Sequence, residues 1–270
     1  MEESILPTLA IPDFDDSISE EIVKDFRNRY AAIIKNPRKL SIDTSMIQWA
    51  LKLEKGMKVL DVGCRHGFQL YELAAKGIAS NGLDILPEHT AIVNRIAKAN
   101  DLHEQVEAVN GDACNMPFKD ESFHGIYGFS CFEHIWDKDK AIKECIRVLK
   151  PGGRLLICEG NPLYFNSFIR YCFRNYFASR GRYGGLTWLF RRNRVIDNYR
   201  EGWKGRDEDV HSMFWWMRYL HQFKELEAIV CGTTFYYYLI GGHLRRKWAK
   251  MLFPLMPFIG GVMIIAEKRE

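Results

Sequence analysis

The sequence has 270 residues, of which 47% are hydrophobic and 27% charged, and its formal net charge is +4. This balance is that of an ordinary globular protein, and it excludes disorder, collagen-like repeats and a disulfide-rich scaffold. The seven cysteines are scattered and form no Cys-x-x-Cys pair. Neither a metal site nor a disulfide framework is therefore expected, and a reducing cytoplasm is the natural location.

No amino-terminal targeting signal is expected, because residues 1–7 lack a basic stretch followed by an apolar core. Near the other end, the apolar run at 253–266 is 14 residues long and holds two prolines and two glycines. Such a run is too short and too interrupted to span a bilayer. These features predict a cytoplasmic protein.

Apolar residues with helical spacing predict helices at 18–33 and 43–53, separated by a break at Asn36-Pro37. From residue 57 onward, short apolar strands alternate with amphipathic helices. The expected strands are 57–62, 79–84, 106–110, 123–129 and 154–158, and the expected helices are 68–75, 88–99 and 138–149. Residues 150–153 (Lys-Pro-Gly-Gly) are interpreted as a stop between the last helix and the last strand.

Strands that alternate with helices indicate βαβ units and a Rossmann-like, doubly wound α/β sheet. Regular alternation ends near residue 160, and the later elements expected are a helix at 209–223, a strand at 226–231, a helix at 241–256 and a strand at 262–267. We therefore expect four parts: an N-terminal helical segment covering the ligand site (1–55), a core (56–160), a helical cap for the substrate (161–225) and C-terminal strands (226–270).

The charge is unevenly distributed. Residues 159–206 contain ten Lys or Arg and three Asp or Glu, a local net charge of +7, and they are rich in aromatic side chains. Such an insert suggests an anionic partner: a phosphorylated or acidic substrate, a lipid headgroup or nucleic acid. A solvated helical surface is the equally weighted alternative.

A strand-to-helix turn within residues 59–68 (Val-Leu-Asp-Val-Gly-Cys-Arg-His-Gly-Phe) is the most informative stretch. Gly63 permits a tight turn and close approach of the backbone to a ligand, and Gly67 lets the following helix pack closely. A dinucleotide-binding fingerprint would need glycine at the positions of Arg65 and Phe68. The sequence therefore disfavours a nicotinamide-dependent dehydrogenase.

Acidic residues accompany three successive strands. Asp61 lies in the first strand, where a carboxylate would repel a pyrophosphate and attract an ammonium group. Asp84 ends the second strand and suits two hydrogen bonds from ribose hydroxyls. Asp112 follows the third strand and suits the exocyclic amine of adenine, although Gly-Asp is also a common turn pair. Adenosine joined to an amino acid, without a phosphate, describes S-adenosylmethionine.

With these residues the chain resembles the class I S-adenosylmethionine-dependent methyltransferases, in particular the small-molecule branch often called type 11. The resemblance is carried, in the family's order and spacing, by five motifs: VLDVGCRHG (59–67), GLDI (82–85), GDACNMPF (111–118), FHGIYGFSCFEHI (123–135) and RVLKPGGRLLI (147–157). Each motif is weak alone, and the five together cover roughly residues 56–159. The resemblance implies a seven-stranded sheet whose last strand, here 262–267, runs antiparallel.

By position, the resemblance implies eight cofactor-binding residues: Asp61, Gly63 and Gly67 at the methionine end, Asp84 at the ribose, Ile85, Asp112 and Ala113 at the adenine, and Ser130 near the methyl group. Arg65 departs from the family, which has glycine at this position. Its side chain must leave the turn toward solvent or reach for an anion, and the alternative is a weak or lost cofactor binder.

Three residues are candidates for acid or base catalysis. Glu133 and His134 follow the fourth strand, and His211 lies in the predicted cap. The plainer interpretation is that His134 hydrogen-bonds the backbone and orders its loop, and that a lone histidine such as His211 is structural. No metal is required for methyl transfer, and no metal-ligand spacing is present.

The sequence thus predicts methylation of a small-molecule, saccharide or lipid-linked acceptor, with the anionic surface of a membrane as a further partner. The acceptor atom, O, N or C, is left open. An RNA methyltransferase is the first alternative, but nucleic acid is disfavoured because the Asp/Asn-Pro-Pro-Tyr signature is missing at 130–133. A non-catalytic protein that keeps the fold is the second.

Overall fold

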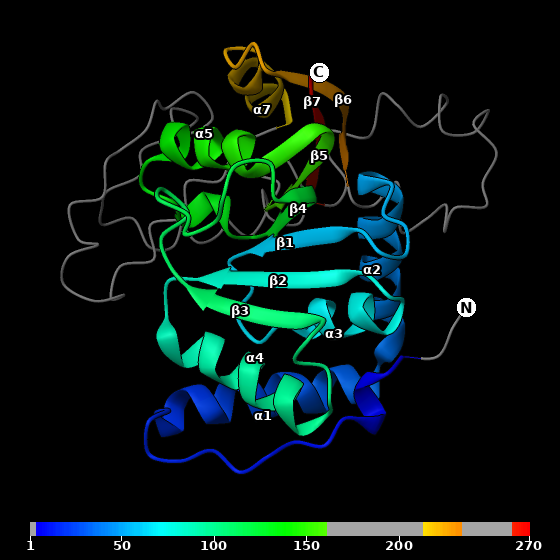
Figure 1. The fold of residues 1–270 in the computed structure, drawn as a ribbon, viewed down its shortest axis with the longest axis vertical. Helices are drawn as coiled ribbons and strands as arrows, with labels where there is room; N and C mark the ends of the chain where they lie inside the picture. The colour runs from blue at the N-terminus through cyan, green and yellow to red at the C-terminus, as the bar shows by residue number, and fades with distance from the viewer. Residues whose placement is uncertain (1–3, 161–212, 234–260) are drawn as a thin grey trace, which may run out of the picture. The chain divides into compact units, whose positions relative to one another are not determined.

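The computed structural model of the protein describes residues 4–160, 213–233 and 261–270 (Figure 1). Its strands are β1 (Lys58–Val62), β2 (Ala79–Asp84), β3 (Val106–Asn110), β4 (Phe123–Phe129), β5 (Leu149–Glu159), β6 (Leu226–Thr233) and β7 (Val262–Lys268). Its α-helices are α1 (Glu20–Lys35), α2 (Pro37–Leu51), α3 (Phe68–Ala75), α4 (Pro87–Ala99), α5 (Lys138–Val148) and α7 (Met213–Leu220). Short 3-10 helices lie at η1 (Leu6–Thr8) and η2 (Phe132–His134).

Hydrogen bonds link the seven strands in the order β3-β2-β1-β4-β5-β7-β6, and the last strand of the chain is antiparallel. β1 pairs in parallel with both β2 and β4, and β2 pairs in parallel with β3. The strand order therefore reverses at β1, and ligands of such sheets bind outside the carboxyl ends of the strands at this switch point. The predicted seven-stranded α/β sheet is confirmed.

The chain divides into two compact units. The first comprises residues 1–128, 137–156 and 267–270, and the second comprises residues 129–136 and 157–266. The four-part division expected from the sequence stays a prediction, since 161–212, most of the expected cap, and the expected helix at 241–256 lie outside the described residues. Within the ranges that the structure describes, none of the helices is both long enough and apolar enough to cross a bilayer.

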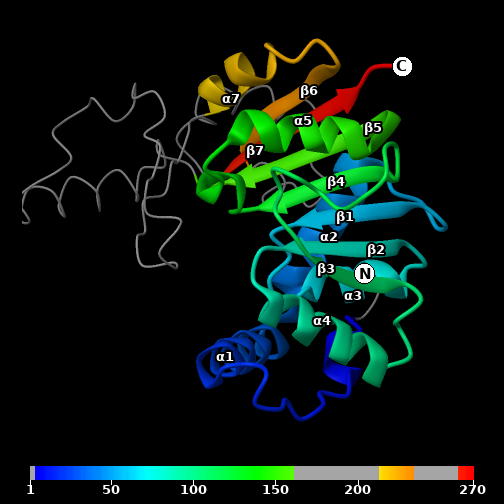
Figure 2. The same cartoon turned by 60° about the vertical axis from the view of Figure 1, so that its left-hand side comes forward.

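Three helices of the first unit meet in one apolar core. α1 contributes Phe26, α3 contributes Tyr71, and α4 contributes Ile92 and Ile96, all of them buried. In both ribbon views α1 lies alongside α4 (Figures 1 and 2). Burial of side chains of this size stabilises a fold by about 1.5–3 kcal/mol each. This core fixes α1 beside the turn that precedes α3.

Several boundaries agree with the sequence residue for residue: those of α3, β2, β3 and β4. α2, in contrast, begins at Pro37 rather than at the expected residue 43. Proline is favoured in the first turn of a helix, where its missing N–H has no helical partner to lose. The Asn36-Pro37 break is therefore a helix start, and the two N-terminal helices are nearly continuous in sequence.

The start of β5 was predicted wrongly. The strand begins at Leu149, so residues 150–153, expected to form a stop, lie within it. Gly152 adopts a φ of 71°, which glycine reaches without the steric penalty of a side chain. The strand can therefore bend at this point without ending.

Gly67 and Gly56 offer a matched pair for testing the packing of α3. Both have positive φ, +65° and +86° respectively, but a Cβ on Gly67 would lie 2.8 Å from Val93 Cγ2, whereas one on Gly56 would meet nothing within 4 Å. We expect Gly56→Ala to cost about 1–2 kcal/mol from backbone strain alone. Gly67→Ala should cost a further 1–3 kcal/mol, roughly, from overpacking.

Denaturant unfolding of the two variants and the parent protein measures the backbone-strain cost and the overpacking cost as losses of unfolding free energy. Equal losses of unfolding free energy in the two variants would contradict the close packing of the turn against α4.

Candidate functional site

The turn between β1 and α3 (residues 63–67) is fastened to the end of β2. The amide of Gly63 donates to Leu83 O at 2.8 Å, and the amide of Cys64 donates to the same oxygen at 3.1 Å. Gly63 has a φ of +74° and is exposed, as expected for a residue whose backbone a ligand approaches. Gly67 begins α3 in the left-handed region and is buried.

Asp84, the last residue of β2, connects this turn to the start of α4. Its Oδ2 accepts the Arg65 amide at 2.8 Å, and its Oδ1 accepts the Leu86 amide at 2.9 Å and lies 3.2 Å from His89 Nδ1. Burial raises the pKa of Asp84, but these hydrogen bonds outweigh it and the net shift is downward. The lowered pKa keeps Asp84 ionised at neutral pH. A carboxylate has about four acceptor positions, so Asp84 can accept about one further hydrogen bond on Oδ2.

Asp61 is buried between two neighbouring strands. It stands in register with Gly82 of β2 and Tyr127 of β4, and its exposed fraction is 5%. Burial raises the pKa of Asp61 well above its ordinary range, the charge of Asp84 adds to this, and the Tyr127 hydroxyl opposes it. A positively charged ligand group beside Asp61 would favour its ionised form.

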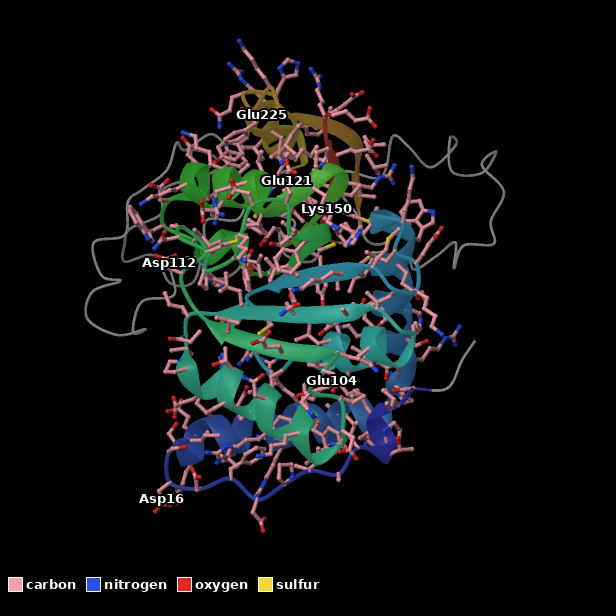
Figure 3. All side chains as sticks on the ribbon, in the orientation of Figure 1. Asp16, Glu104, Asp112, Glu121, Lys150 and Glu225 are labelled. Carbon is pink, nitrogen blue, oxygen red and sulfur yellow. The ribbon has the colours of Figure 1, made fainter. Side chains whose placement is uncertain are left out.

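The ends of β2 and β3 form the expected adenine side of the site. Ile85 is a large apolar residue with 41% of its surface exposed, as a surface for a flat ring requires. The Asn110 side chain donates to the carbonyls of Asp84 and Ile85 at 3.0 and 2.9 Å and so holds this end in place. Asp112 and Ala113 are half-buried, and Figure 3 shows Asp112 at the edge where β2 and β3 end.

One oxygen of Asp112 is already engaged. Its Oδ1 accepts the Cys114 amide at 2.8 Å, which is the arrangement of an aspartate-initiated turn. The turn interpretation of Gly111-Asp112 is thus confirmed. Because Oδ2 is not used in this turn, adenine binding by Asp112 stays a prediction.

The Arg65 side chain contacts an anionic side chain, which is one of the two orientations expected from the sequence. Its Nη2 lies 2.9 Å from Asp25 Oδ2 in α1, and His66 Nε2 lies 2.8 Å from the same oxygen. Arg65 adopts a φ of 50°, a conformation that costs a residue with a side chain about 1–2 kcal/mol. This cost explains why glycine is usual at the corresponding position of the methyltransferases that the sequence resembles. In this protein, the contacts of Arg65 with Asp25 and Asp84 offset the cost.

In the second unit, the loop after β4 is held by a buried acid that sequence reasoning did not select. Glu159 Oε1 accepts the amides of Phe132 at 2.9 Å and Cys131 at 3.3 Å. Burial raises the pKa of Glu159 well above its ordinary range, and the nearby carboxyl of Glu133 raises it further. Ser130 is exposed, and its amide donates to Cys158 O at 2.7 Å.

Two of the three catalytic candidates lie together in this loop. His134 Nε2 lies 3.8 Å from Glu133 Oε1, with His134 partly exposed and Glu133 buried. The distance allows an electrostatic interaction but is too long for a hydrogen bond. His211, the third candidate, lies outside the described residues.

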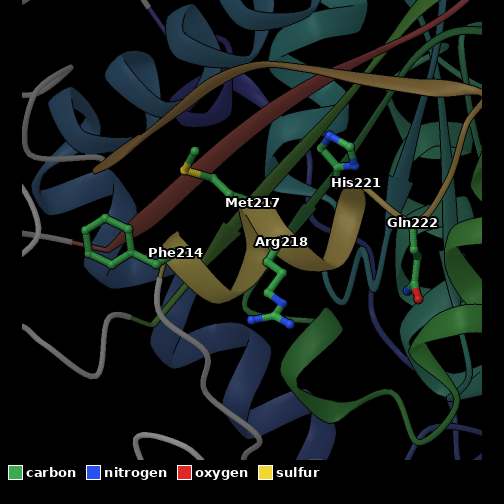
Figure 4. Close-up of a pocket in the computed structure, with 5 residues that line it drawn as sticks. All are labelled: Phe214, Met217, Arg218, His221 and Gln222. Carbon is green, nitrogen blue, oxygen red and sulfur yellow. The ribbon is translucent and has the colours of Figure 1, made fainter.

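A surface depression lies on α7 and the two residues that follow it, within the second unit (Figure 4). It is lined by Phe214, Met217, Arg218, His221 and Gln222. None of these residues is among the predicted site residues. On the opposite side of α7, the buried Trp216 packs edge-on against Phe132 with ring centroids 6.2 Å apart.

Residues 60–157 match a protein family described as a methyltransferase domain. This segment runs from within β1 to within β5 and includes the acids Asp61, Asp84 and Asp112. It is a class I methyltransferase domain.

Curated relatives of the methyltransferase domain agree with this assignment. Norajmaline N-methyltransferase of Rauvolfia serpentina is 39% identical over 105 residues, which are 38% of this chain and 36% of that protein. Tocopherol O-methyltransferase of Arabidopsis thaliana is 36% identical over 105 residues, 38% of this chain and 30% of that protein. The chain thus spans about a third of the length of these relatives.

The fold agrees with a solved methyltransferase. A structure described as an S-adenosylmethionine-dependent methyltransferase from Aquifex aeolicus superposes with a TM-score of 0.55 and 17% identity. The superposition covers 95% of this chain and all of that one, 100%. At this identity the comparison supports the fold.

The residues of the methyltransferase domain fit S-adenosylmethionine, the cofactor of class I methyltransferases. The buried Asp61 provides an acid for a cationic amino-acid group, and the ionised Asp84 has acceptor capacity for a ribose hydroxyl. The exposed Ile85 provides an apolar surface for the base. No pyrophosphate-binding feature is needed for this ligand.

Sequence reasoning missed the residues that support the predicted ones: Asp25, His89, Asn110 and Glu159. His89 and Asn110 contact Asp84, Glu159 accepts the amides that follow Ser130, and Asp25 contacts the turn at 65–66. Only His89, five positions after Asp84, is close in sequence to its partner among the predicted site residues. Asn110 and Glu159 could have been selected from the sequence, since each is a polar residue that ends a strand.

His66 makes the stability of this turn sensitive to acid. Burial lowers the pKa of His66 to about 4, although its hydrogen bond to Asp25 opposes this. The unfolded chain binds a proton near pH 6.5, so the folded state holds fewer protons between pH 4 and 6.5 and loses stability as the pH falls through this window. The loss is at most about 1.4 kcal/mol per pH unit.

Replacing His66 by Gln keeps a donor for Asp25 and removes the titration. We expect urea unfolding between pH 4 and 7 to show a shallower fall in unfolding free energy for His66→Gln than for the parent protein. Parallel pH profiles would rule out a neutral buried His66.

Proposed function

We propose that this protein transfers a methyl group from S-adenosylmethionine to a small-molecule acceptor. One observation carries the proposal: acids at three successive strands, Asp61, Asp84 and Asp112, stand at the carboxyl edge of a methyltransferase domain. The amino-acid, ribose and base parts of the cofactor need these groups in that order along the sheet.

The chain's own residues would bind and orient rather than react. S-adenosylmethionine supplies an activated methyl group on a sulfonium, which is a good leaving group. Asp61 would neutralise the amino-acid ammonium, Asp84 would accept a ribose hydroxyl, and Asp112 would accept from the adenine amine with its second oxygen. Within the first unit, Gly63 is exposed in the turn after β1, and within the second unit Ser130 is exposed just after β4.

An acceptor that carries a proton on its nucleophilic atom would need a base. His134 is partly exposed and has the buried Glu133 carboxyl 3.8 Å away, which would stabilise the imidazolium that forms. We assign His134 as the base and Glu133 as its electrostatic partner.

The acceptor class is narrowed by the relatives and by the sequence. The two relatives are named for N-methylation of norajmaline and O-methylation of tocopherol, both small molecules. The basic residues between 159 and 206 favour an acidic or lipid-linked acceptor, presented at an anionic membrane surface, over a neutral soluble one.

The predicted cofactor site can be tested with S-adenosylhomocysteine, the demethylated form of the cofactor, as the ligand. Asp84→Ala removes an ionised acceptor and should weaken binding by about 100-fold, and it should also lower the melting temperature, because the amides of Arg65 and Leu86 lose their acceptor. Asp84→Asn, which keeps the side-chain size and one acceptor, should give an intermediate loss.

Glu104→Ala is the matched control, because Glu104 is an exposed acid just before the start of β3, at the opposite end of the strand from Asp112 (Figure 3). Isothermal titration calorimetry on all four proteins gives the affinities. An unchanged affinity in Asp84→Ala would contradict the placement of the ribose.

Methyl transfer itself is tested by incubating the protein and isotopically methyl-labelled S-adenosylmethionine with fractionated cell extract. We expect label in a small-molecule or lipid fraction and none with His134→Ala at neutral pH. Label in RNA would favour the nucleic-acid alternative, and tight cofactor binding without label in any fraction would favour a non-catalytic protein.

A further inference from the structure

A single carboxylate joins the N-terminal helix to the cofactor turn. Asp25 Oδ2 in α1 lies 2.9 Å from Arg65 Nη2 and 2.8 Å from His66 Nε2. Arg29 also bonds Asp25, through Nε at 3.1 and 3.2 Å, but it lies one turn along the same helix. Only the bonds to Arg65 and His66 cross from α1 to the turn.

The surroundings of Asp25 keep it charged. Burial raises the pKa of Asp25, but the hydrogen bond with His66 and the charges of Arg65 and Arg29 outweigh it and lower the pKa to about 2. His66, at 1% exposure, has no solvent to replace Asp25 as its partner. The contact is therefore charge-assisted, and its loss would leave the buried His66 Nε2 without a partner.

Aromatic packing lies directly beside this contact. Phe26, the neighbour of Asp25, stacks on Phe68 with centroids 5.8 Å apart and meets the His66 ring edge-on at 5.5 Å. α1 is thus held to the turn by an apolar contact and an ionic contact side by side. The ionic contact can be removed by replacing Asp25 alone, which leaves the Phe26 packing in place.

The contact extends to the ribose acid. Arg65 bonds Asp25 with its guanidinium and Asp84 with its backbone amide at 2.8 Å. The left-handed conformation of Arg65, φ 50°, persists because both ends of the residue are held. A movement of α1 that frees the guanidinium would therefore loosen the amide that Asp84 accepts.

We propose that Asp25 is a positioning residue of the cofactor site, whose carboxylate latches α1 onto the turn at 63–67, so that the nucleoside enters and leaves when this latch opens. The inference rests on the proposed function and deepens it by assigning α1 a role in cofactor exchange. If the Asp25 contact forms in both the free and the cofactor-bound protein, it stabilises the two states equally. It then changes the rates at which the cofactor binds and leaves, and has little effect on the dissociation constant.

The test measures the rates at which S-adenosylhomocysteine binds to and leaves the full-length protein, by surface plasmon resonance. In Asp25→Asn, which loses the charge at nearly constant size, both the association and the dissociation rate constants should rise by about tenfold. The dissociation constant should stay within about threefold of the parent value, since the two changes cancel.

Two further variants separate the latch from general effects. Arg29→Ala removes a partner of Asp25 that does not touch the turn, so both rate constants should stay within about twofold of the parent values. Asp25→Glu restores the charge one methylene further out and should return both rate constants toward the parent values. A purely structural role for Asp25 would not produce this paired rise and rescue.

Hydrogen exchange of the α1 amides without ligand gives a readout that does not depend on cofactor binding. Asp25→Asn should speed exchange across α1 and leave exchange in α5 unchanged. If the parent protein binds no S-adenosylhomocysteine, the proposed function and this inference both fail, whereas normal binding with unchanged rates in Asp25→Asn overturns the latch alone.

A third pattern is also decisive. A faster association with unchanged dissociation, and hence tighter binding, would mean that Asp25 competes with the ligand's own carboxylate for Arg65, and would overturn the latch.

Discussion

The hydrogen bonds of the Asp84 carboxylate are the constraint on which the rest of the site depends. They fix the amide of Arg65 in the turn after β1 and the amide of Leu86 before α4, so two separate backbone segments are set by one side chain. The register of β1 against β2 brings these segments together, and Asn110 secures the same end from β3. A ligand bound at Asp84 would therefore meet a preorganised edge.

Charge gives this edge its chemical preference. Asp61 and Asp84 are both buried acids, and the charge of Asp84 raises the pKa of Asp61. A ligand with a positive group relieves this repulsion, whereas a phosphate would increase it. Arg65, the cationic residue of the described turn, is already paired with Asp25. The arrangement selects a cationic nucleoside over a dinucleotide.

Most of the parallel core could be predicted from the sequence, because its strands are short and alternate with helices that repeat apolar residues at helical spacing. β5 was misjudged because Gly152 bends a strand where Pro-Gly-Gly predicts an end. The candidate acids could be selected because they lie at or beside the carboxyl ends of three successive strands. Asp25 could not, because its partners Arg65 and His66 lie 40 and 41 positions away and no local pattern links them.

A crystal structure of the protein with S-adenosylhomocysteine bound tests the central claim most directly. The account predicts the ribose hydroxyls at Asp84, the base against Ile85 and beside Asp112, and the amino-acid end at Asp61 and Gly63. A nucleoside bound away from the ends of β1, β2 and β3, or an Arg65 side chain filling the place of the methionine, would contradict it.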